Sequence, residues 1–136
     1  MLDLSQPRHQ HIAERLRANV IAWLGSVRPD GRPHLVAVWF LWNDEHILIF
    51  SKPNNQKVRN LRQNPNVTLA LDDTNEGDDP IVIEGSAELV DDPDISTNLA
   101  AYLAKYGEAM KEIGLPGAEM AKVYSQAIRI TPSRVI

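Results

Sequence analysis

The sequence has 136 residues, of which 43% are hydrophobic, and it carries a formal net charge of −4. This length and apolar content suffice for one hydrophobic core, so we expect a single domain spanning residues 1–136. The acidic balance argues against a general affinity for nucleic acid, and the lack of cysteine excludes disulfides and thiolate metal sites. No apolar run approaches the ~20 residues that cross a bilayer, so we expect a soluble, cytoplasmic protein without membrane contact.

The first half of the chain predicts one helix and three strands. Apolar residues recur at three- and four-residue spacing over 8–18, which is the helical period. Strands are expected at 21–27, 35–42 and 46–51, and Pro, Asp and Gly supply a tight turn at 28–33. The segment 35–42 is apolar at every position, so we expect both of its faces to be covered. A buried central strand explains this pattern, and so does a strand with a ligand on its second face.

The second half predicts two helices and three further strands. An asparagine of the pair Asn54–Asn55 offers an N-cap side chain to a short helix over 55–63, which Pro65 ends. A long amphipathic helix follows over 95–113 and ends at Gly114. The remaining segments are strands at 67–71, 81–90 and 124–130, an acidic loop at 72–79 and a short turn at 117–122. Hairpin-linked strands without a βαβ series favour a six-stranded antiparallel barrel over a parallel sheet.

The stretch 51–71 is the most informative for function, because it contains four basic residues and no acidic one. Lys57 falls in the first turn of the predicted helix, where free amides and the helix dipole favour an anion such as a phosphate. The alternative is a solvated basic helix face. By contrast, we expect Lys105, on the late amphipathic helix, to be a solvated surface charge.

Other polar groups indicate little chemistry. The acidic loop lacks the final ligand carboxylate of a calcium-binding loop, since the chain has Ile83 there. His9 and His11 have no evident third ligand, so no metal site is expected, and His34 and His46 are isolated. No serine lies in a nucleophile-elbow motif, so a hydrolytic triad has no support. The three tryptophans are expected in the core. The catalytic residues therefore stay unassigned, as suits a protein whose cofactor carries the redox chemistry.

Four segments together resemble the split-barrel flavoproteins around pyridoxamine-phosphate oxidase. In chain order they are Leu24–His34, Ala37–Trp42, Lys57–Val67 and Glu84–Glu88. The match covers most of the chain, and residues 102–134 are similar in particular to a short subgroup described as coenzyme F420-dependent reductases. The resemblance implies a mainly β fold with some α, a split β-barrel of six antiparallel strands in a Greek-key-like order with a few flanking helices. It also implies a homodimer with two cofactor sites across the interface.

The resemblance further implies which residues bind FMN or coenzyme F420. The residues beside the isoalloxazine or deazaflavin ring would be Val36, Ala37, Val38 and Trp39. The residues that border the ring and the ribityl chain would be Phe50 and Ser51. The residues at the phosphate would be Gln56 and Lys57, with Arg62 as a further contact.

Two departures from the family pattern change the expected activity. The vitamin-metabolising oxidases carry a phosphate-contacting arginine on the second strand, and the aligned residue here is Val36. They also end in a substrate-binding segment with arginine and histidine, where this sequence has Ser133–Ile136. We therefore expect an F420-binding oxidoreductase that transfers hydride to a small unsaturated organic acceptor. The alternatives are an FMN-dependent reductase or oxidase, and a flavin-binding protein without turnover.

Overall fold

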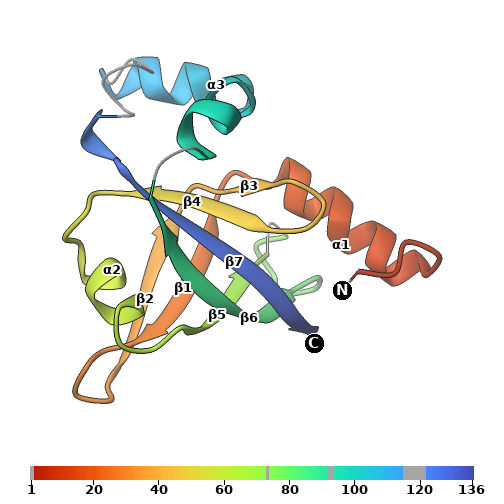
Figure 1. Cartoon of the computed structure of the whole chain (residues 1–136). Helices are drawn as coiled ribbons and strands as arrows, with labels where there is room; N and C mark the ends of the chain where they lie inside the picture. The colour runs from red at the N-terminus through yellow and green to blue at the C-terminus, as the bar shows by residue number, and fades with distance from the viewer. Residues whose placement is uncertain (1, 73, 92–93, 115–121) are drawn as a thin grey trace.

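The computed structural model contains a seven-stranded antiparallel sheet that curls into a split barrel (Figure 1). It describes residues 2–72, 74–91, 94–114 and 122–136, and for residues 94–99 it describes the backbone only. The strands are Ala22–Val27 (β1), Pro33–Val38 (β2), Leu41–Trp42 (β3), Ile47–Ser51 (β4), Asn66–Leu71 (β5), Ile81–Val90 (β6) and Gln126–Val135 (β7). Their order in the sheet is β2-β1-β5-β6-β7-β4-β3. The predicted split barrel is thus confirmed, with one strand more than expected.

The connection between β2 and β3 explains why the sheet curls. These strands form the two edges of the sheet, yet only Trp39 and Phe40 separate them in the chain. Successive Cα atoms are ~3.8 Å apart, so the two edges must approach within roughly 11 Å of one another. The prediction of a single strand over 35–42 is therefore wrong. The chain leaves one edge of the sheet after Val38 and joins the other edge at Leu41.

Among the described residues, the helices with defined bounds are Pro7–Ala18 (α1), Gln56–Leu61 (α2) and Asp94–Glu112 (α3), and they flank the barrel. All three were predicted from the sequence. Figure 1 shows α3 across one end of the barrel and α1 at its side. Asn55 is the N-cap of α2, but its side chain makes no capping hydrogen bond, so that part of the prediction is wrong. The predicted turn at 117–122 lies almost entirely outside the described residues.

Apolar side chains form two cores, one inside the barrel and one beneath α3. The buried members of the second core are Leu41, Leu48, Phe50, Tyr102, Tyr106, Met110 and Ala127. All five residues of β4 are buried, because Ile47 and Ile49 face the barrel while Leu48 and Phe50 face α3. β4, with one core on each side, is therefore the apolar strand with both faces covered.

β2 does not have the two covered faces that its sequence suggests. Val38 is buried in the barrel core, whereas Leu35, on the opposite face, is 65% exposed. Ala37 is also exposed, and its cross-strand neighbour Trp23 is 50% exposed rather than in the core. The outer face of β2 is therefore apolar, and no described part of the chain covers it.

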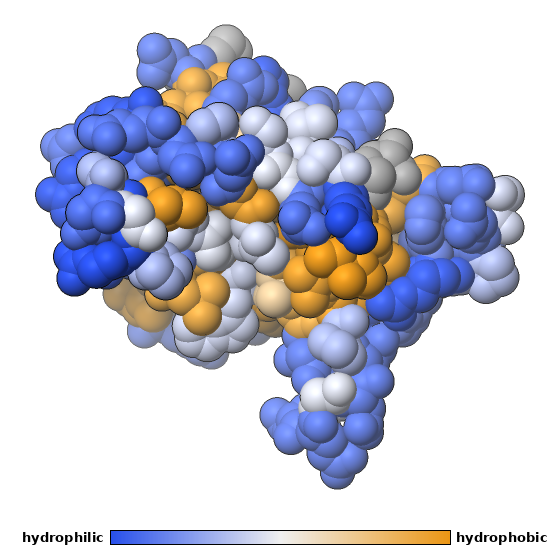
Figure 2. All heavy atoms as spheres, turned by 90° about the horizontal axis from the view of Figure 1, so that it is seen from below, coloured by the Kyte–Doolittle hydropathy of each residue, from blue (hydrophilic) through white to orange (hydrophobic). Residues whose placement is uncertain are grey.

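β7 continues through Pro132 to Val135, beyond the predicted end at Ile130. The pairing of β6 with β7 shifts register between Glu84 and Gly85, and such an irregularity accommodates a proline within a sheet. Figure 2 shows the end of the molecule opposite α3, where apolar surface in the middle is flanked by polar side chains. Among the described residues, no helix combines the length and the apolar character needed to span a membrane.

Candidate functional site

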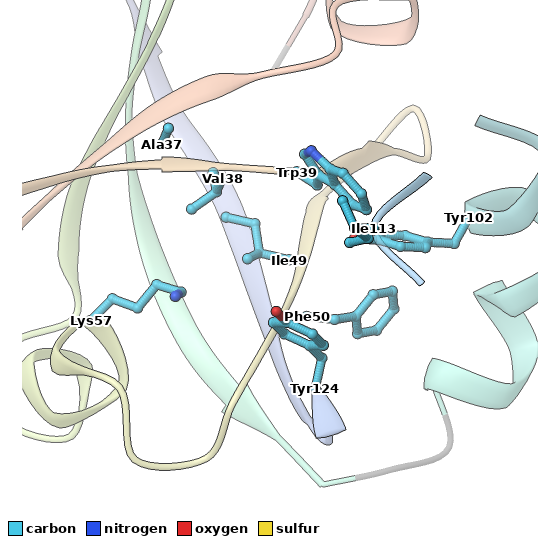
Figure 3. Close-up of a pocket in the computed structure, with 9 residues that line it drawn as sticks. All are labelled: Ala37, Val38, Trp39, Ile49, Phe50, Lys57, Tyr102, Ile113 and Tyr124. Atoms are coloured by element: carbon cyan, nitrogen blue, oxygen red, sulfur yellow. The ribbon is translucent and has the colours of Figure 1, made fainter. Parts of the chain in front are cut away.

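A pocket of about 200 Å³ lies between β2, β4, α2 and the end of α3 (Figure 3). Its walls are apolar or aromatic apart from one lysine. The lining residues are Ala37, Val38, Trp39, Ile49, Phe50, Lys57, Tyr102, Ile113 and Tyr124. Because these residues come from distant parts of the chain, the pocket exists only once the barrel has closed and α3 has packed.

Lys57 supplies the charge in the lining. Its side chain extends from the first turn of α2, and Figure 3 shows the ammonium group directed toward Ile49 and Phe50. Burial among apolar side chains lowers the pKa of Lys57. Within the described part of the chain, the ammonium group has no carboxylate or other hydrogen-bond acceptor as a partner. A half-buried cation of this kind is stabilised when an anionic ligand binds beside it.

Aromatic side chains form the part of the pocket opposite Lys57 (Figure 3). The Trp39 ring stacks on the Tyr106 ring behind the lining, with centroids 4.6 Å apart and planes 7° apart. Tyr102 meets Phe50 edge to face at 5.1 Å. Burial raises the pKa of Tyr106 to about 12, so its phenol is neutral at physiological pH. Flat apolar surfaces at one end and a cation at the other suit a planar ring that carries an anionic group.

The family model for pyridoxamine 5'-phosphate oxidase matches residues 9–136 of the chain. The chain belongs to this family. No curated protein matches the chain.

Solved structures share the fold of this pyridoxamine 5'-phosphate oxidase family member. The conserved hypothetical protein Rv2991 from Mycobacterium tuberculosis is 26% identical, with a TM-score of 0.75 over 93% of this chain and 81% of that chain. A protein described as an F420 reductase is also 26% identical, with a TM-score of 0.69 over 90% and 94% of the two chains. The heme storage protein HutZ from Vibrio cholerae has a TM-score of 0.72 over 96% and 92%, and its 18% identity shows a shared fold alone.

The residues expected from the family resemblance are only partly brought together. Those that line the pocket are Ala37, Val38, Trp39, Phe50 and Lys57. Val36 points into the barrel and packs against its core. Ser51 is fully buried, and its hydroxyl donates to the Lys52 carbonyl at 2.9 Å.

The two remaining expected residues are held within their own segment. Gln56 donates from its side-chain amide to Asn60 Oδ1 at 2.7 Å. Arg62 is exposed and donates to the Pro53 carbonyl at 3.2 Å.

Sequence reasoning missed four lining residues: Ile49, Tyr102, Ile113 and Tyr124. The apolar stripe predicted over 95–113 includes Tyr102 and Ile113, which indicates a buried helix face. Tyr102 is indeed buried, whereas Ile113 follows the end of α3 and is 61% exposed. That stripe does not indicate what the helix packs against. No sequence signal distinguishes these residues from ordinary core residues.

Lys105 is not the solvated charge that the sequence suggested. Its Nζ donates to the Phe40 carbonyl at 3.0 Å and lies 3.9 Å from the centroid of the Phe40 ring. Burial lowers the pKa of Lys105 to about 8. The carbonyl oxygen and the ring face both favour the ammonium form, so the side chain is charged at neutral pH. The prediction failed because helical periodicity placed Lys105 beside the apolar stripe but could not show a carbonyl within reach.

His34 adds a second basic group near Lys57, and the sequence alone left it isolated. Burial is the main cause that lowers the pKa of His34, and the positive charges of Arg28 and Lys57 act in the same direction. Its Nδ1 is buried without a hydrogen-bond partner among the described residues. The positive charges of Arg28 and Lys57 therefore both act on His34 and favour its neutral form.

Proposed function

We propose that the protein binds coenzyme F420 in this pocket and acts as an oxidoreductase that transfers hydride to a small unsaturated organic acceptor. The observation that carries the proposal is the Lys57 ammonium group, which is half-buried, lacks an anionic partner among the described residues, and faces an apolar and aromatic pocket. The ammonium donor of Lys57 and the aromatic wall together suit a planar ring joined to a phosphate. When bound, the deazaflavin supplies the hydride.

The lining residues have separate tasks in this proposal. Lys57 binds the phosphate of the cofactor. Trp39, Phe50 and Tyr102 pack against the ring and exclude water from it. β2 is an edge strand, so part of its backbone lacks partners in the sheet and is available to the polar atoms of the ring.

The choice of F420 over FMN is supported by the 26% identity to a protein described as an F420 reductase. FMN is the alternative, because it also combines a flat tricyclic ring with a phosphate. The fold by itself decides neither the cofactor nor catalytic turnover, since a heme storage protein has the same fold.

We also propose that two copies of the chain pair through the outer face of β1 and β2. A pocket of about 200 Å³ is smaller than the ~300–1,000 Å³ of typical ligand sites, so one chain supplies only part of a site. Trp23 and Leu35 leave apolar surface exposed on this outer face. A hollow of about 750 Å³ with walls from β1, β2, β5, β6 and β7 includes Leu35 in its lining. Isologous pairing would cover this surface and let each chain complete the other's pocket.

The test starts from protein that has been freed of any co-purified cofactor. This protein is titrated with F420 and, separately, with FMN, and ligand fluorescence measures the binding. We expect tighter binding of F420, and hydride transfer from reduced F420 to at least one member of a panel of enones and related acceptors. Tighter binding of FMN would support the FMN-dependent alternative. Binding of F420 without transfer to any acceptor would indicate a binding protein, and failure of both ligands would contradict the proposed site.

A further inference from the structure

Side chains of α3 hold the short connection between β2 and β3. The Phe40 N–H donates to the Tyr106 hydroxyl oxygen at 3.0 Å, and the Phe40 carbonyl accepts from Lys105 Nζ at 3.0 Å. The Tyr106 hydroxyl donates to the Val20 carbonyl at 2.7 Å and also lies 3.0 Å from the Phe40 carbonyl oxygen. We call Tyr106 and Lys105, acting together on Phe40, the α3 clasp. It replaces the ladder bonds that a continuous strand would make here.

The Tyr106 part of the α3 clasp is shielded from water. Phe40 is 0% exposed and Tyr106 is 1% exposed, so water cannot replace the bond between them. A buried N–H that loses its acceptor pays the full desolvation penalty. The Lys105 ammonium also lies over the Phe40 ring, which adds a cation–π contact to the bond with the carbonyl. The peptide of Phe40 is therefore fixed by two side chains from one helix.

The α3 clasp is directly connected to the pocket through Trp39. Trp39 precedes Phe40 in the chain, lines the pocket, and stacks face to face on the Tyr106 ring. Tyr106 thus restrains Trp39 in two ways, through the neighbouring peptide and through the stack. Neither Tyr106 nor Lys105 lines the pocket itself.

We propose that Tyr106 and Lys105 are positioning residues that fix Trp39 and thereby set the width of the slot for a planar ring. The identity of that ring as a deazaflavin or flavin rests on the proposed function. The ring selectivity of the pocket is then determined by α3, a helix outside the barrel, as well as by the strands.

The experiment compares the parent with Tyr106→Phe, which keeps the stack but removes the hydroxyl, and with Lys105→Met, which keeps the aliphatic stem. Lys111→Met, at an exposed position of the same helix, is the matched control. Fluorotryptophan labelling gives one fluorine NMR resonance for each of the three tryptophans, assigned by Trp→Phe variants. The ligand is lumichrome, which has the flavin ring system without the phosphate tail and so does not depend on Lys57.

We expect the Trp39 resonance to shift or broaden in Tyr106→Phe and Lys105→Met without ligand, and to stay unchanged in Lys111→Met. Lumichrome affinity should fall roughly tenfold in Tyr106→Phe, because binding must then order Trp39, which the parent already holds in place. If Tyr106→Phe does not fold, Lys105→Met decides the test. An unchanged Trp39 resonance, parental lumichrome affinity in the variants, or no lumichrome binding to the parent would overturn the proposal. Failure of F420 and FMN to bind while lumichrome behaves as expected would instead contradict the proposed function alone.

Discussion

Replacement of Lys57 tests whether this residue binds phosphate or is merely a surface charge. A charge-assisted hydrogen bond to phosphate contributes ~1.5–3 kcal/mol, so Lys57→Ala should weaken cofactor binding by roughly ten- to more than a hundredfold. The melting temperature should stay the same or rise slightly, because the variant removes an ammonium group that burial destabilises. Fluorescence titration and thermal melting measure the two effects.

Lys111→Ala is the control for that experiment, since Lys111 is an exposed lysine in the last turn of α3. It should leave both cofactor affinity and melting temperature at the parental values. Parental affinity in Lys57→Ala would show that the phosphate does not bind at this pocket.

Lys105 should make the stability of the fold depend on pH in the alkaline range. Its pKa is lowered from 10.5 to about 8 by burial. Between these two values the unfolded chain keeps a proton that the folded protein has lost, so the free energy of unfolding increases as pH rises through this window. Lys105 is partly exposed, which limits the effect to under about 1 kcal/mol.

The measurement is the melting temperature of the parent relative to Lys105→Met at about pH 7.5 and about pH 10. The melting temperature of the parent, relative to that of Lys105→Met, should be higher at the higher pH than at the lower pH. A shift in the opposite direction would mean that the ammonium form is bound more tightly in the folded state than in water, through Phe40.

At the scale of elements, the pairing of β6 with β7 depends on a close backbone approach at Gly85. A Cβ at this position would lie 2.7 Å from the Thr131 carbonyl oxygen and 3.0 Å from a methyl carbon of Ile130. Gly85→Ala should therefore lower the free energy of unfolding by ~1–3 kcal/mol, as overpacked sites do. Denaturant titration measures this loss.

Gly107 of α3 is the matched control for Gly85, because no atom lies within 4 Å of the position that its Cβ would take. Gly107→Ala should keep or raise stability, by up to about 1 kcal/mol, since alanine favours a helix interior. Equal stability of the two variants would mean that β7 can move away from β6 without cost.

At the scale of the whole molecule, the exposed apolar face of β1 and β2 predicts a homodimer. We expect an interface at or above the ~2,000 Å² of obligate pairs, and a dimer by light scattering at micromolar concentration. Leu35→Asp should give a monomer with weakened cofactor binding, because it places a charge in the contact. Leu103→Asp, on exposed α3 surface, should remain dimeric. A monomeric parent would contradict the prediction.

The sequence by itself determined the local elements of this protein. Apolar residues recur every three or four positions in a helix and alternate in a strand. These patterns depend only on nearby residues, so they located α1, α2, α3 and most strands. Gly31 lies in the turn between β1 and β2, and Gly114 follows the end of α3. Their φ angles of 88° and 72° are conformations that few other residues adopt easily. The order of the four family motifs predicted the barrel, and with it five residues of the pocket lining.

Only the tertiary structure decided which element covers which apolar face. An apolar residue pattern reports that a side chain prefers burial, but it does not name the partner, because the partner is distant in sequence. The stretch from Leu35 to Trp42 therefore predicted one strand. In the structure it is divided between the two edges of the curled sheet, and Tyr106 and Lys105 bond to Phe40 at the division. The same long-range packing brought Tyr102 to the pocket. It also partly buried Lys105, which the sequence had predicted to be a solvated charge.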